Sequence, residues 1–301
     1  MYICTNRCNM ELNKTILGDA LTVLKTFPDN CINCCITSPP YYGLRNYDSD
    51  GQIGNEETPE LFIKNLTDIF NEVRRVLTDD GTLWLNIGDT YASTSHTNRN
   101  FINHGGRGGN NPNISSNMKM IGNGVKEKDL IGIPWMLAFS LRNSGWHLRQ
   151  DIIWHKLNPM PEPALDRCVK SHEYIFLLTK NDKYYFDREA IQEKSVTQEK
   201  PRNKRDVWSV SVSKNKKAHF ATYPEALITP CALAGCPEGG IILDPFMGSG
   251  TTGKVALKNN RNFIGIELNP EYKQICDEEI EEVLKNASIG KEKEGSVGNP
   301  D

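Results

Sequence analysis

Apolar residues fall along this chain in two spacings, one typical of helices and one typical of buried strands. Between residues 60 and 77 the apolar positions lie three or four apart, which predicts a helix with one buried stripe. A second helix is expected over 134–142, and shorter ones through 21–27 and 255–257. Short apolar runs bounded by turn-forming residues predict strands at KTILG, CINCCIT, TLWLNIG, HLRQDIIWH, EYIFLLT, GGIILDP and NFIGIEL. Because strands and helices alternate, the sequence predicts an α/β fold with a doubly wound, mostly parallel sheet.

Two irregular regions interrupt this alternation. Residues 92–127 are rich in Gly, Asn and Ser, and residues 181–218 are polar and basic. Irregular segments of this length in a compact domain are usually functional, or become ordered on a partner. We therefore expect one domain over 15–285 that contains both regions as insertions. Residues 1–14 are expected to form an N-terminal extension, and residues 286–301, rich in Gly, Lys, Glu and Ser, a disordered tail.

Charge is unevenly distributed, although the formal net charge is only −3. The stretch from Tyr91 to Lys126 contains basic residues and no acidic ones, and the second irregular region is mostly basic. A basic sector on a mildly acidic body fits a polyanionic partner, and a plain solvated surface is the equal alternative. The basic residues of interest are Arg99, Arg107, Lys119, Lys200, Arg202, Lys204 and Arg205.

Nine cysteines raise the question of a metal site. Only Cys31 and Cys34 have the C-x-x-C spacing, and they lie inside a predicted buried strand, whereas a zinc ribbon needs two such pairs. We expect buried free thiols in a reducing compartment, and no metal. No apolar run reaches the ~20 residues of a membrane span, and no secretory signal opens the chain. A cytoplasmic protein without a membrane partner is therefore expected.

The segment that follows the strand GGIILDP contains a glycine turn. The strand ends at Asp244, Gly248 and Gly250 lie in the turn, and the next strand ends at Glu267. Glycines let a ligand approach the backbone, and an acidic residue about 20 positions on can hold a ribose hydroxyl pair. The same letters fit the phosphate-loop pattern G-x-x-x-x-G-K of nucleotide hydrolases. That pattern requires Ser or Thr next, and Val255 stands there instead, which disfavours an ATPase.

A second motif, Thr37-Ser38-Pro39-Pro40-Tyr41-Tyr42, follows the strand CINCCIT. Open α/β sheets bind their ligands at such carboxyl ends of strands. The prolines stiffen the turn and leave backbone carbonyls without neighbouring amide donors. Ser38 offers a hydroxyl and Tyr41 an aromatic face, so together they form a slot that accepts hydrogen bonds from an amino group while stacking its ring. A proline-rich turn with two surface tyrosines is the alternative.

The two motifs together resemble a known family. TSPPYYGLRNYD resembles the catalytic motif of DNA amino-methyltransferases, and DPFMGSGTT resembles their cofactor motif almost letter for letter. The catalytic motif precedes the cofactor motif, which is similar to the circularly permuted β-group of that family. The resemblance spans most of residues 15–275. It implies that the strand KTILG lies beside the C-terminal strands of the sheet.

The resemblance implies S-adenosylmethionine as cofactor, an amino group of a base rotated out of the duplex as acceptor, and no metal ion. It implies a catalytic role for Ser38, Pro39, Pro40 and Tyr41. It implies cofactor binding by Asp19, Thr37, Asp244, Pro245, Phe246, Gly248, Ser249, Gly250, Thr251 and Glu267. Cytosine carbon-5 methylases use a Pro-Cys nucleophile, and Tyr41 follows Pro40 here, so no covalent enzyme intermediate is expected.

The serine before the two prolines resembles cytosine N(4) enzymes more than adenine N(6) enzymes. The resemblance therefore implies N(4) methylation of cytosine, with adenine N(6) as the alternative and an RNA or protein amide substrate as a further one. Double-stranded DNA is the expected partner, with 92–127 as a DNA-contacting loop, 181–218 as the target-recognition region and the basic residues named above as phosphate contacts. A cognate restriction endonuclease and a homodimer are left open.

Overall fold

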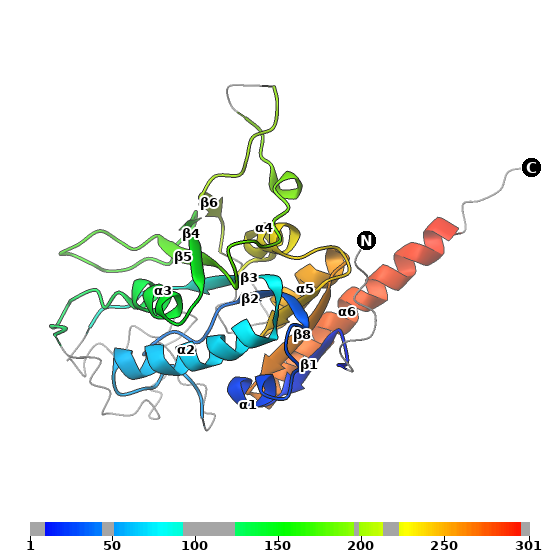
Figure 1. Ribbon diagram of the computed structural model, residues 1–301. Helices are drawn as coiled ribbons and strands as arrows, with labels where there is room; N and C mark the ends of the chain where they lie inside the picture. The colour runs from blue at the N-terminus through cyan, green and yellow to red at the C-terminus, as the bar shows by residue number, and fades with distance from the viewer. Residues whose placement is uncertain (1–9, 44–50, 93–123, 196–198, 213–222, 296–301) are drawn as a thin grey trace, which may run out of the picture.

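The predicted strands assemble into one sheet. The computed structural model describes residues 10–43, 51–92, 124–195, 199–212 and 223–295, with side chains described to residue 286. In this part of the chain eight strands lie in the order β1-β8-β7-β2-β3-β5-β4-β6 (Figure 1). Strand β5 runs antiparallel to β3 and β4, and the other neighbouring pairs are parallel. The strands are β1 (Lys14–Leu17), β2 (Ile32–Thr37), β3 (Leu77–Ile87), β4 (His147–Lys156), β5 (His172–Thr179), β6 (Val207–Val210), β7 (Ile241–Asp244) and β8 (Asn262–Glu267). The predicted α/β class is confirmed.

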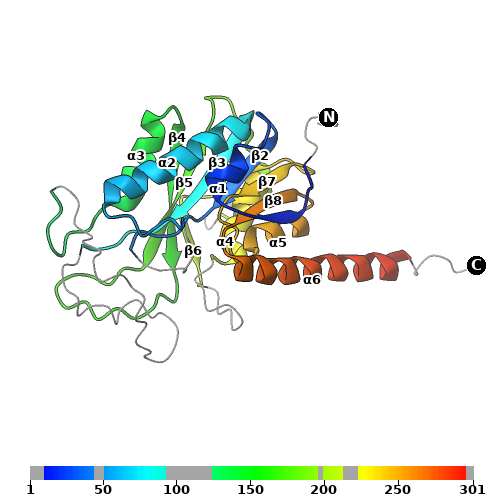
Figure 2. The ribbon, with the colours of Figure 1, turned by 90° about the horizontal axis from the view of Figure 1, so that it is seen from below.

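Helices cover both faces of this sheet, as Figure 2 shows edge-on. One face carries α1 (Ala20–Leu24), α2 (Pro59–Val76) and α3 (Ile133–Asn143), and the other carries α4 (Glu225–Gly235), α5 (Thr251–Lys258) and α6 (Pro270–Gly295). A short 3-10 helix, η2 (Glu189–Ile191), precedes β6. Because the central strands are buried on both sides, their sequences are apolar without alternation. In β2, Cys35 packs into the hydrophobic core between the sheet and α1, α2 and α3, and Cys34 packs into the core on the opposite face.

Helix α2 matches its prediction from apolar spacing. The Thr58 side chain accepts a hydrogen bond from Leu61 N, and Pro59 occupies the first turn, where its missing N–H costs nothing. Phe62, Leu66 and Phe70 form part of the buried stripe. The helix is therefore fixed both by its cap and by one apolar face.

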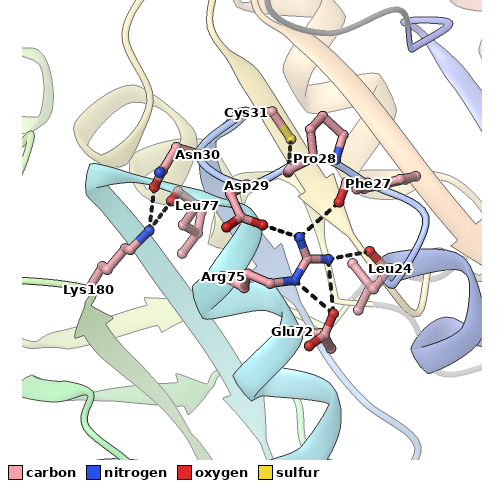
Figure 3. A network of polar contacts seen from close by, with 10 residues as sticks. All are labelled: Leu24, Phe27, Pro28, Asp29, Asn30, Cys31, Glu72, Arg75, Leu77 and Lys180. Carbon is pink, nitrogen blue, oxygen red and sulfur yellow. Dashed lines mark hydrogen bonds and ion pairs between the residues drawn. The ribbon is translucent and has the colours of Figure 1, made fainter.

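The last turn of α2 clamps the connection between α1 and β2 (Figure 3). The Arg75 guanidinium donates to the carbonyls of Leu24 and Phe27, both at 2.9 Å. It also pairs with the carboxylates of Asp29 and Glu72. These bonds fix the position of the amino end of β2, and thereby the position of the whole strand.

The first strand lies beside the last one, as the permuted order predicts. Lys14 pairs with Ile264 in a parallel ladder between β1 and β8. The Thr15 hydroxyl lies 3.1 Å from Cys276 Sγ of α6. Segments from opposite ends of the sequence thus complete one half of the sheet, and the permuted arrangement is confirmed.

The ends of the first irregular region are held together. Tyr91 and Leu130 form an isolated β-bridge, and Ala92 N donates to the Asp129 carbonyl at 2.8 Å. The region between them therefore starts and finishes close to the carboxyl end of β3. Residues 93–123 lie outside the described residues, and with them the predicted DNA contacts Arg99, Arg107 and Lys119.

The second irregular region contains a strand that the sequence analysis missed. Residues 207–210 form β6, which pairs in parallel with β4 at the edge of the sheet. Trp208 anchors this strand, because its ring is only 5% exposed in the core that also contains Trp154, and its indole N–H donates to the Arg205 carbonyl at 2.6 Å. Part of 181–218 is therefore built into the sheet.

Two predicted boundaries also differ from the structure. Helix α6 continues to Gly295, beyond the predicted domain end at residue 285, and it extends away from the sheet in Figure 2. Strand β3 begins at Leu77 directly after α2. Its pairing with β2 steps from Ile32–Leu77 to Cys34–Thr82, so the residues that precede the predicted strand TLWLNIG form a bulge within β3.

The described cysteines are free thiols, as predicted. All of them are buried except Cys168, and Cys31 and Cys34 both lie in the region of β2. The described residues contain no group of three or more His, Cys, Asp or Glu that could hold a metal ion. Within the same residues, no helix combines the length and the apolar character that crossing a membrane requires.

Candidate active site

The carboxyl ends of β1, β2, β7 and β8 meet at one edge of the sheet, where a cavity of about 230 Å³ opens. This is the place where open α/β sheets bind ligands. The four predicted catalytic residues line it, namely Ser38, Pro39, Pro40 and Tyr41. So do seven predicted cofactor residues, Asp19, Pro245, Phe246, Gly248, Ser249, Thr251 and Glu267. Three others are not among the residues that line it, Thr37, Asp244 and Gly250.

The two glycines of the turn after β7 serve different purposes. Gly248 has φ +53°, and a Cβ built there would meet open space. The absence of a side chain at this position therefore leaves space in the cavity. Gly250 has φ +85°, and a Cβ there would lie 2.8 Å from Cys276 Sγ of α6. Gly250 therefore allows α5 and α6 to pack closely, whereas Gly248 leaves room for a ligand.

Glu267, at the end of β8, is a buried carboxylate held by backbone donors. Its Oε2 accepts a hydrogen bond from Gly248 N and its Oε1 one from Asn269 N, both at 2.8 Å. Burial raises the pKa of Glu267, and backbone hydrogen bonds, including these two, oppose that rise. Nearby, the Ser249 hydroxyl is buried and has no hydrogen-bond partner among the described residues. A buried polar atom of this kind indicates room for a polar ligand.

Asp244 lies behind the cavity wall, and other residues of the protein satisfy its carboxylate. Its Oδ1 accepts from the Thr37 hydroxyl at 2.6 Å and from Phe246 N at 3.0 Å. Its Oδ2 accepts from the hydroxyls of Thr252 at 2.5 Å and Tyr223 at 3.0 Å. Complete burial raises the pKa of Asp244 despite these bonds. The carboxylate ties the turn after β7 to the end of β2.

The two tyrosines of the Ser38–Tyr42 segment separate. Tyr41 lines the cavity and is half-buried. Tyr42 is 1% exposed, and its ring packs 5.3 Å from that of Phe62 in α2. The alternative of a turn with two surface tyrosines is therefore wrong. Tyr42 anchors the segment, and Tyr41 faces the ligand space.

The Tyr41 ring is held at its hydroxyl end and at its edge. Its hydroxyl donates to Glu173 Oε2 of β5 at 2.7 Å, and Asn86 Nδ2 of β3 donates to the same oxygen at 3.3 Å. A Cβ on Gly88 would lie 2.7 Å from a ring carbon of Tyr41, so only glycine lets the ring lie there. Neither Glu173 nor Asn86 belongs to a motif that the sequence predicts as functional. The available signal was their place at the cavity ends of two predicted strands.

A lysine shares the Glu173 carboxylate. Lys156, the last residue of β4, pairs with Glu173 Oε1, and its ammonium lies 4.7 Å from the centre of the Trp154 ring. Lys156, Trp154 and Glu173 all line the cavity. None of them belongs to either of the predicted motifs.

The phosphate-loop alternative fails on the position of its lysine. Lys254 of α5 is 9% exposed, and its ammonium pairs with Glu279 of α6 at 2.8 Å. It is not among the residues that line the cavity. A phosphate-loop lysine has to reach the phosphates of the nucleotide, and this one is committed to a neighbouring helix.

The described part of the second basic region contains four predicted DNA contacts, Lys200, Arg202, Lys204 and Arg205. Arg202 pairs with Glu193 at 2.9 Å across a β-bridge between the two residues. The Lys204 ammonium lies 4.9 Å from the centre of the Trp208 ring. Lys200 and Arg205 are exposed. The structure thus leaves two of the four cations exposed and engages the other two with protein groups.

Comparison with known proteins agrees with this geometry. A family model described as DNA methylase matches residues 32–278. The chain is 49% identical over 272 residues to the Type II methyltransferase M.Cfr9I of Citrobacter freundii, across 89% of this chain and 88% of that protein. It is 47% identical to the Type II methyltransferase M.SmaI of Serratia marcescens, across 90% and 92%. A Thermus thermophilus protein described as a putative DNA modification methylase, complexed with S-adenosyl-L-methionine, aligns with TM-score 0.61 and 25% identity, across 90% of this chain and 93% of that one.

The fold, the cavity and these likenesses define an S-adenosylmethionine-dependent DNA methyltransferase. More particularly, the chain belongs to the DNA methylase family of enzymes that modify N6 or N4 amino groups, and the relatives that share 47–49% identity with it are Type II methyltransferases.

Proposed function

We propose that this methyltransferase transfers a methyl group to the N(4) amino group of cytosine in double-stranded DNA. The observation that carries the proposal is that one cavity is lined by both predicted motifs, Ser38 to Tyr41 after β2 and Pro245 to Ser249 after β7. The acceptor and the methyl donor therefore have adjoining places in one space. Cytosine is chosen over adenine because Ser38 precedes the two prolines, and a serine at this place resembles the motif of cytosine N(4) enzymes.

The residues at the cofactor end of the cavity have hydrogen-bonding groups that suit S-adenosylmethionine. The Glu267 carboxylate accepts backbone hydrogen bonds, among them those from Gly248 N and Asn269 N, and its two oxygens retain lone-pair capacity for a ribose hydroxyl. The buried Ser249 hydroxyl can bond the amino acid part of the cofactor, beside the open wall at Gly248. Asp19 accepts from Thr22 N and Oγ1 through Oδ1 alone, so its Oδ2 can accept from an adenine amino group.

When bound, S-adenosylmethionine supplies an electrophilic methyl group on a sulfonium sulfur, so no metal ion is required. The task of the protein is to present the amino nitrogen. Ser38 Oγ and the Pro39 carbonyl accept hydrogen bonds from the amino group and keep its lone pair out of conjugation with the ring. Tyr41 stacks on the base after it leaves the duplex. The rate is then gained by positioning and by electrostatics, and not by a covalent intermediate.

Thr37, Asp244 and Gly250 act behind the cavity in this proposal. Their side chains or backbone connect the two loops that hold the substrates, and direct cofactor contact is not required of them. DNA contact falls first on the exposed cations Lys200 and Arg205. The Type II names of the relatives favour a cognate restriction endonuclease. A homodimer stays a prediction, to be checked by sedimentation equilibrium.

The test is methyl transfer from labelled S-adenosylmethionine to mixed-sequence duplex DNA, with product nucleosides separated by mass spectrometry. N(4)-methylcytosine is the expected product. N(6)-methyladenine would keep the residue roles and overturn the choice of base. The variant Ser38→Ala should lose most of its turnover and keep its affinity for the cofactor, because Ser38 is placed at the acceptor end. Normal turnover of Ser38→Ala would remove the proposed role of this residue.

A further inference from the structure

The cavity contains one cation in a fixed position. Among the described residues that line it, Lys156 is the only basic one. Its side chain is 21% exposed, and the carboxylate of Glu173, 12% exposed, pairs with it. Its ammonium lies over the Trp154 ring at 4.7 Å from the ring centre. An ammonium has three donors, and a carboxylate oxygen together with an aromatic face leaves donor capacity for a ligand.

The same carboxylate sets the place of the predicted stacking ring. Glu173 Oε1 binds Lys156, and Glu173 Oε2 accepts the Tyr41 hydroxyl at 2.7 Å. Asn86 Nδ2 reaches Oε2 as well, at 3.3 Å, and also donates to the Tyr174 carbonyl at 3.0 Å. The loop after β2 and the strands β3, β4 and β5 are thereby joined through one side chain. A base stacked on Tyr41 would have a lysine donor held at a set position relative to its ring.

We infer that Lys156 is a specificity-determining residue that donates a hydrogen bond to the O2 carbonyl of the target cytosine, and that Glu173 is its positioning residue. The inference rests on the proposed function, because it takes the amino group of the base to be held by Ser38 and Pro39. With that group fixed, the six-membered rings of cytosine and adenine present different edges. Cytosine has N3 and then the C2 carbonyl, whereas adenine has N1 and then a C2–H.

The chemistry of an ammonium explains why this edge matters. Lysine can only donate, so a C2 carbonyl completes its hydrogen bonding, whereas a C2–H leaves one of its desolvated donors without an acceptor. A site built to bond a polar group strongly rejects the analogue that lacks it. Lys156 therefore adds a preference for cytosine that the serine and proline acceptors cannot supply, because both bases offer them the same amino group.

The experiment removes the carbonyl from the base and the ammonium from the enzyme, separately and together. The target sequence is first mapped by sequencing DNA modified by the wild-type enzyme. The target cytosine is then replaced by a 2-aminopyridine C-nucleoside, which keeps the amino group and the adjacent ring nitrogen and has C–H in place of the carbonyl. Single-turnover methylation rates are measured for wild type and Lys156→Met on both duplexes. Comparing the two penalties cancels the intrinsic difference in reactivity between the bases.

The wild-type enzyme is expected to lose at least about tenfold more rate on the analogue than Lys156→Met does, the scale of one hydrogen bond to a charged group. Lys156→Arg, which keeps a donor, should recover part of the difference. Glu173→Gln should shrink it, because the amide no longer holds the ammonium as an ion pair. If Lys156→Met does not fold, Glu173→Gln carries the same comparison.

The matched control is Lys254→Met, which removes another largely buried ion pair, with Glu279, away from the cavity lining. It should lower stability and leave the analogue penalty at the wild-type value. Equal penalties in wild type and Lys156→Met, within about twofold, would overturn the inference and leave a structural role for the ion pair. This failure differs from failure of the proposed function. In that case the wild-type enzyme itself would yield N(6)-methyladenine, and the inference would fall with it.

Discussion

Replacing Glu267 by Gln should weaken S-adenosylmethionine binding and leave the protein folded. The Glu267 side chain accepts Gly248 N through one oxygen and Asn269 N through the other, both at 2.8 Å. A glutamine amide has one oxygen and one NH₂ group, so one backbone N–H would face another donor. A ribose hydroxyl would also lose its charged acceptor. A hydrogen bond to a charged group contributes about 1.5–3 kcal/mol, which corresponds to a rise in Kd of roughly ten- to a hundredfold.

Isothermal titration calorimetry of the cofactor against wild type and Glu267→Gln measures this loss. Glu279→Gln is the matched control, because Glu279 pairs with Lys254 on neighbouring helices and is not among the residues that line the cavity. The control should keep the wild-type Kd. If Glu267→Gln binds the cofactor within about twofold of wild type, the carboxylate does not hold the ribose.

The pH dependence of the same titration supplies an independent check. Burial raises the pKa of Glu267 above its usual value of 4.5. The ionised form is the better hydrogen-bond acceptor. The affinity for S-adenosylmethionine should therefore be highest above the raised pKa and should fall as the pH drops through it. The fall should therefore begin at a higher pH than an ordinary carboxyl would give. Glu267→Gln should remove this part of the pH dependence, and an unchanged profile in the variant would assign the titration to another group.

Three further substitutions test the remaining parts of the site. Tyr41→Phe removes the 2.7 Å hydrogen bond to Glu173 and keeps the aromatic face that stacks on the base. Single-turnover methylation rates should fall by about tenfold, and the cofactor Kd should be unchanged. Asp244→Asn replaces an acceptor of four donors, so urea unfolding should register a loss of about 2–4 kcal/mol; a loss below about 1 kcal/mol would contradict the network. Lys200→Ala should reduce the slope of log DNA affinity against log salt concentration by about one. Arg202→Ala should reduce this slope by less, because Arg202 is already paired with Glu193. Equal slopes for the two variants would contradict this difference.

The sequence predicted well what depends on local pattern. The spacing of apolar positions over 60–77 gave α2 within a residue at each end, and the buried runs gave the central strands. The Gly248 turn and the Ser38 segment were found because each follows a strand, and parallel strands bring their carboxyl ends to one edge. Local patterns and a common sheet direction were therefore enough to bring both motifs to one cavity.

What the sequence did not reveal depends on contacts between distant segments. Glu173 and Lys156 lie in two strands that are joined by an antiparallel ladder, and nothing in either strand marks a partnership with Tyr41. Strand β6 is only four residues long and lies in a basic stretch, so its composition indicates a loop. It is a strand because Trp208 finds a place in the core beside Trp154. Such outcomes are decided by tertiary packing and not by local propensity.

Asp244 shows how a residue of the cofactor motif can matter through its contacts with other parts of the protein. Its Oδ1 accepts both from Thr37, which directly precedes Ser38, and from Phe246 N in the turn after β7. One atom thus fixes the distance between the loop after β2 and the turn after β7, the two segments proposed to hold the amino group and the cofactor. Methyl transfer depends on that distance to within a fraction of an ångström, whereas binding of either substrate alone does not. Loss of this carboxylate should therefore lower kcat more than it raises the Kd of the cofactor, which separates it from Glu267.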